Sequence, residues 1–63
     1  MKKLLADILS RISAKIETCE KAMEELAQSE YLDNEEQLQL RMIAIDLHLS
    51  RNGTDRMVER LNS

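Results

Sequence analysis

The chain has 63 residues, a formal net charge of −3 and one cysteine. A domain of this size buries only about 60% of the surface that its unfolded form exposes, and its core needs support from a disulfide, a metal or a second subunit. One cysteine excludes an internal disulfide, and one cysteine with one histidine excludes a structural zinc site. Oligomerisation is the remaining source of stability.

The composition predicts helices. Proline is absent, glycine occurs once, and Tyr31 is the only aromatic residue. The pI near 5 argues against general affinity for nucleic acids, which usually requires a basic patch. The first apolar residues are interrupted by Asp7 and Arg11, too early for a signal peptide, and no apolar run approaches the roughly 20 residues of a membrane span. We expect a cytoplasmic protein that does not bind membranes.

Residues 2–29 are predicted to form one amphipathic helix. Apolar side chains recur every seven residues along this segment, a repeat typical of left-handed packing against another helix. The residues expected in the intrachain core are Leu5, Ile8, Ile12, Ile16, Cys19, Met23 and Leu26.

The segment 29–34 is predicted to be a turn. Asp33 followed by Glu36, or Asn34 followed by Gln37, resembles a capping box and marks the start of a second helix. Because the connection is short, the two helices are expected to lie antiparallel as a hairpin.

The segment 38–49 carries two apolar stripes on opposite sides of the predicted second helix, 34–51. Its local alternation of apolar residues also fits a strand, but the capping signals and the break in phase at Met42-Ile43 favour the helix. The stripe expected to pack on the first helix, within the intrachain core, consists of Leu38, Met42, Ile45 and Leu49. The opposite stripe consists of Leu40, Ile43 and Leu47.

Asn52-Gly53 is predicted to end the second helix, since glycine commonly follows a helix C-terminus. A short third helix over 55–62 would then begin after Thr54; alternatively, the second helix continues through Gly53. In both cases the tail extends the second stripe. The predicted interface with a second copy or a partner is Leu40, Ile43, Leu47, Met57, Val58 and Leu61.

No constellation of residues predicts catalysis, a cofactor or a metal site. His48 has no nucleophile placed beside it, and Asp46 has no second carboxylate set against it to form an acid–base pair. Cys19 lies on the heptad line and is predicted to be a small packing residue. The basic residues near the tail are predicted to be solvated; they are Arg51, Arg56 and Arg60.

Two resemblances suggest alternative functions. The length and layout are similar to those of the plasmid copy-number protein Rop, a dimer of helical hairpins, which would imply RNA binding. The spacing of Ile16-Glu17, Met23, Leu32 and Asp46 is similar to that of small sporulation phosphatases, which would imply hydrolysis of a response-regulator phospho-aspartate. Their signature Ser-Gln-Glu-Leu-Asp agrees with this chain only at Asp46.

The sequence therefore predicts a single all-α domain over 1–63, an antiparallel helical hairpin with a short C-terminal helix that dimerises into a four-helix-bundle-like assembly. We expect a small regulatory or adaptor protein, bacterial or phage-encoded, that binds itself and an unidentified protein partner and is not an enzyme. RNA binding and phosphatase activity are the alternatives.

Overall fold

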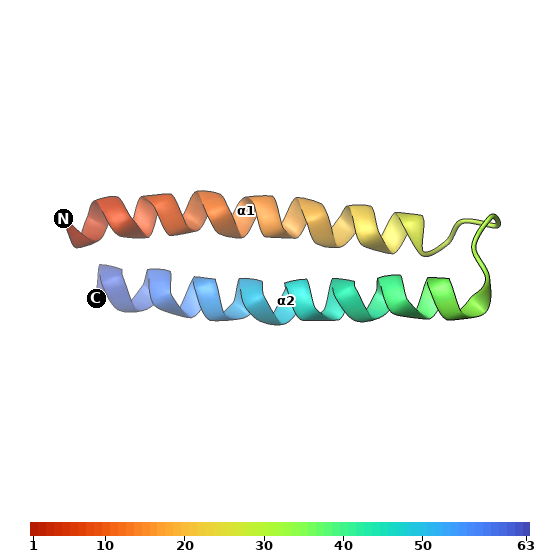
Figure 1. Cartoon of the computed structure of the whole chain (residues 1–63). Coiled ribbons are helices and arrows are strands. Elements are labelled where there is room, and N and C mark those ends of the chain that lie inside the picture. The colour runs from red at the N-terminus through yellow and green to blue at the C-terminus, as the bar shows by residue number, and fades with distance from the viewer.

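The computed structural model describes residues 1–63 and contains two helices, α1 (Lys2–Leu26) and α2 (Asn34–Asn62). The helices pack side by side and antiparallel, so that both termini lie at the same end of the hairpin (Figure 1). The predicted all-α hairpin is confirmed. The molecule is a rod with Cα extents of 47 × 14 × 10 Å. Neither helix combines the length and the apolar character needed to cross a membrane.

A side chain of α2 makes hydrogen bonds to the connection between the helices. α1 ends at Leu26, three residues before the predicted end. The side-chain amide of Gln37 donates to the carbonyl oxygen of Ser29 at 2.9 Å and lies 3.5 Å from that of Leu32. These contacts satisfy backbone acceptors that lie outside both helices.

The predicted capping box begins α2. The backbone N–H of Glu36 donates to the Asp33 carboxylate at 2.8 Å, and the backbone N–H of Asp33 donates to the Glu36 carboxylate at 3.0 Å. Asp33 is thus the cap, and Asn34 is the first helical residue. Glu35 and Glu36 lie in the first turn, where the helix dipole favours negative charge.

The predicted break at Gly53 is wrong, because α2 continues without interruption to Asn62. Gly53 has no positive φ, so it does not adopt the left-handed conformation of a helix cap. Helical glycine costs about 1 kcal/mol relative to alanine. Val58 and Leu61 are half-buried on α1, and this packing offsets the cost by keeping the tail in the helix.

The seam, which we define as the contact between α1 and α2, is built from small and polar residues. The buried residues are Ala6, Ser13, Glu20, Ala27 and Ala44, and no large side chain is fully buried. Along α1 and its C-cap, the buried residues Ala6, Ser13, Glu20 and Ala27 recur every seven residues. Half-buried residues complete the seam; they are Leu9, Ile16, Met23, Gln37, Leu40, Leu47, Arg51, Thr54, Val58 and Leu61. The alternating spacing of three and four residues is that of a coiled coil.

Replacing the cap residue should weaken the hairpin. Asp33→Ala removes the acceptor for the Glu36 N–H, and we expect a loss of about 1 kcal/mol in the free energy of unfolding. Urea denaturation followed by circular dichroism measures this loss. Asn34→Ala is the matched control and should change stability much less, since Asn34 makes no capping bond. Equal losses in both variants would contradict the assignment of Asp33 as the cap.

Gly53→Ala tests whether α2 is continuous. A Cβ built on Gly53 meets nothing within 4 Å, so alanine should raise the free energy of unfolding by roughly 0.5–1 kcal/mol through its higher helix propensity. A helix that ended at a left-handed Gly53 would give the opposite sign. Thermal denaturation of the two proteins in parallel distinguishes these results.

Candidate binding surfaces

A charged cluster crosses one side of the seam. The Nε of Arg51 donates to the carboxylate of Glu20 at 2.5 Å, and Nδ1 of His48 lies 3.0 Å from the other oxygen of the same carboxylate. Arg51 also lies 4.0 Å from the carboxylate of Glu17. The side chain of Glu20 is only 8% exposed, so its charge depends on these partners.

The pKa of Glu20 reflects two opposing effects. Burial disfavours the carboxylate and by itself raises the pKa. Hydrogen bonds from Arg51 and His48, together with their charges, outweigh burial and hold the pKa of Glu20 below its ordinary value of 4.5. The same hydrogen bond has the opposite effect on its donor and raises the pKa of Arg51. The pair therefore remains ionised at neutral pH and fixes the axial register of the helices.

Farther along the seam, the Ser13 hydroxyl donates to the Asp55 carboxylate at 2.5 Å, a second contact that fixes the same register.

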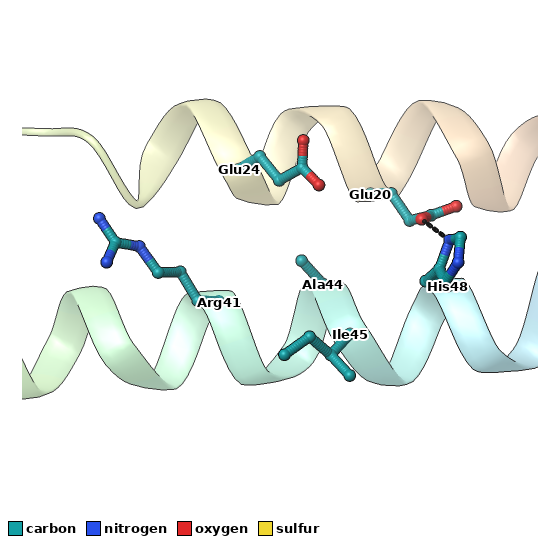
Figure 2. Close-up of a pocket in the computed structure, with 6 residues that line it drawn as sticks. All are labelled: Glu20, Glu24, Arg41, Ala44, Ile45 and His48. Carbon is teal, nitrogen blue, oxygen red and sulfur yellow. Dashed lines mark hydrogen bonds and ion pairs between the residues drawn. The ribbon is translucent and has the colours of Figure 1, made fainter.

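A shallow groove lies next to the cluster on the same side of the hairpin. Figure 2 shows Glu20 and Glu24 on α1 facing Arg41 and His48 on α2. Ala44 and Ile45 form the apolar part of its lining, and the cavity measures about 390 Å³. Glu24 and Arg41 form no ion pair within the chain. The groove is open and carries no set of three or more His, Cys, Asp or Glu side chains that could hold a metal ion.

The opposite side of the seam carries large exposed apolar side chains, interspersed on α2 with Gln39, Asp46 and Ser50, and we call these apolar residues the open face. By the helical period, this face lies on the side of α1 opposite Glu17 and Glu24. On α2 it lies on the side opposite Arg41 and His48. Its large side chains are between 42% and 54% exposed. The open face consists of Leu5, Ile8, Ile12, Cys19, Leu26, Ile43 and Met57.

A second apolar surface lies on α2 alone, and we call it the outer stripe. It consists of Leu38, Met42, Ile45 and Leu49, which are between 56% and 61% exposed. At about 100° per residue, this stripe points roughly 150° away from the seam residues of α2. Most of the stripe therefore faces away from α1 and away from the open face, and Ile45 also borders the groove.

The predicted intrachain core agrees with the observed seam only at Ile16 and Met23. The outer stripe was expected to pack on α1, but the seam uses the opposite side of α2. On α1, only Ile16 and Met23 of the predicted set lie in the seam; Leu5, Ile8, Ile12, Cys19 and Leu26 are exposed in the single chain. The physical reason is that alanine and serine on the line from Ala6 to Ala27 allow closer helix contact than the larger side chains beside them.

The predicted interface residues divide between two surfaces. Ile43 and Met57 lie on the open face, and Leu40, Leu47, Val58 and Leu61 are half-buried in the seam. Sequence analysis missed the roles of Ser13, Glu20, Arg51 and Asp55. A signal was present, because Ser13 and Glu20 occupy the same heptad line as Ala6 and Ala27.

The other residues considered for chemistry have simple surroundings. Asp46 is exposed and makes no hydrogen bond or ion pair within the chain, and His48 belongs to the Glu20 cluster. In comparisons with known proteins, no family model matches the sequence, and neither does any curated protein or solved structure.

The ionised Glu20 should give the hairpin a pH-dependent stability. Because its folded pKa lies below 4.5, the stabilisation is present above pH 4.5 and is lost as the pH falls through the folded value. Glu20→Gln should lower the melting temperature at neutral pH, and the difference from wild type should shrink below pH 4.5. Glu24→Gln, which breaks no ion pair, is the control. A difference that stays constant across this range would contradict the assigned role of Glu20.

Proposed function

We propose that this protein is a small regulatory or adaptor protein without chemistry of its own, which acts by binding other proteins, and that its first partner is a second copy of itself. The observation that supports this most strongly is the distribution of apolar side chains. The fully apolar buried residues are three alanines, whereas eleven leucine, isoleucine and methionine side chains between Leu4 and Met57 are 42–61% exposed.

The second copy would cover the open face. Along α1, the apolar residues Leu5, Leu9, Ile12 and Ile16 alternate between the open face and the seam, and the same pattern continues to Leu26. On α2 the same alternation between the open face and the seam is made by Leu40, Ile43, Leu47, Met57 and Leu61. Each stripe therefore points between the neighbouring helix and the open face. That direction is the one that side chains take toward the axis of a four-helix bundle.

The size of the open face suits a stable dimer. A rod 47 Å long and two helix diameters across, roughly 20 Å with side chains, offers about 900 Å² per copy, against roughly 800 Å² in a standard interface. Completing the burial of a half-exposed leucine or isoleucine contributes about 1 kcal/mol. In a two-fold dimer both copies bury the same face, so each residue contributes this free energy twice.

A foreign protein partner would bind the outer stripe, which the bundle leaves exposed. In a four-helix bundle the outer stripe lies on the corner of α2 farthest from the core, because it points away from both α1 and the open face. A surface of four large apolar side chains fits the groove or helix of another protein. Regulation would then consist of occluding or stabilising that partner.

Charges on the open face should dissociate the dimer. Sedimentation equilibrium should show the wild type as a dimer and Ile12→Glu or Ile43→Glu as monomers or unfolded chains, since each places a carboxylate in the proposed core. Thr18→Glu adds the same charge at an exposed position of α1 and should remain a dimer. A wild type that sediments as a folded monomer at micromolar concentration would defeat the proposal.

A further inference from the structure

The residue spacing of the outer stripe allows it to pack against the same stripe of a second copy. Leu38, Met42, Ile45 and Leu49 follow intervals of four, three and four residues, which is a heptad pattern on a face without an intrachain partner. If α2 packs antiparallel to α2 of another copy, about a two-fold axis level with Ile43 and Ala44, Met42 faces the partner's Ile45 and Leu38 faces the partner's Leu49. All four residues are then paired.

Charges at the ends of the stripe favour the same orientation. Glu35 and Arg56 lie on the heptad line of Met42 and Leu49, one beyond each end, and neither forms an ion pair within the chain. Antiparallel packing brings Glu35 of one copy toward the partner's Arg56, about one helical turn apart along the axis and within reach of two long side chains. Parallel packing would instead set acid beside acid and base beside base.

We infer that a second dimer covers the outer stripe, so that dimers associate reversibly into tetramers through α2. This inference rests on the proposed function, because association of the dimers would control access of the foreign partner to the outer stripe. The apolar contact spans only Leu38 to Leu49, about 16 Å of helix, which is much shorter than the open face. Association through the stripe is therefore the weaker step and masks the partner surface in a concentration-dependent way.

Sedimentation velocity over a range of protein concentrations tests the inference. The wild type should pass from dimer to tetramer as concentration rises into the millimolar range. Ile45→Glu should remain a dimer at every concentration. Since Ile45 is exposed in the hairpin, circular dichroism should show the fold of this variant unchanged.

Charge reversal provides the second arm. Glu35→Arg and Arg56→Glu should each raise the dimer–dimer dissociation constant about tenfold, and the double variant should restore it, because the pair is re-formed with its signs exchanged. Glu25→Arg, a charge reversal on the exposed side of α1, should leave the tetramer intact.

Three results would overturn the inference: a wild type that stays a dimer at all concentrations, a tetramer that survives Ile45→Glu, or a double variant as weak as the single ones. The first would assign the outer stripe to a foreign protein. Failure of the proposed dimer is recognised separately, because the wild type would then be a monomer at low concentration and Ile12→Glu would have no effect on its assembly.

Discussion

Close contact between α1 and α2 depends on small side chains at their seam. Ala6 and Ser13 on α1, Ala27 at its C-cap and Ala44 on α2 are buried because they allow the helices to approach closely. Small residues bury little apolar area, so this contact alone stabilises the hairpin weakly. The large side chains that flank the seam, such as Ile12 and Ile43, remain 42% exposed in the single chain, and the proposed second copy would cover them.

Polar contacts give the seam its register. The Glu20 carboxylate holds Arg51 and His48, and the Ser13 hydroxyl donates to Asp55 on the same side. A buried ion pair adds little net stability, because desolvation opposes the attraction between the charges, but it penalises any axial shift that separates them. The charges on one side and the apolar residues on the other make the two faces of the hairpin chemically distinct. This difference is the reason for placing the proposed self-association on the open face.

The sequence predicted the helices, the antiparallel hairpin and a cap at Asp33 or Asn34, because these depend on local signals and on chain connectivity. It did not predict which side of each helix forms the seam. Periodicity gives the spacing of an apolar stripe but not its direction, and α2 has two stripes of similar size. The predicted helix end at Gly53 failed for a different reason. The capping preference of glycine is a local signal, whereas Val58 and Leu61 pack on α1 and keep the helix intact. The pairing of Glu20 with Arg51, 31 residues apart, has no local signal.

In the proposed dimer, the large apolar side chains are buried between two hairpins and not within one. Isotope-filtered nuclear Overhauser measurements on a mixture of labelled and unlabelled chains test this directly. The methyl groups of Ile12 and Ile43 should show contacts to the unlabelled copy, whereas those of Ala6 and Ala44 should show contacts only within their own chain. Absence of intermolecular contacts at Ile12 and Ile43, in a protein that retains its helices, would contradict the account.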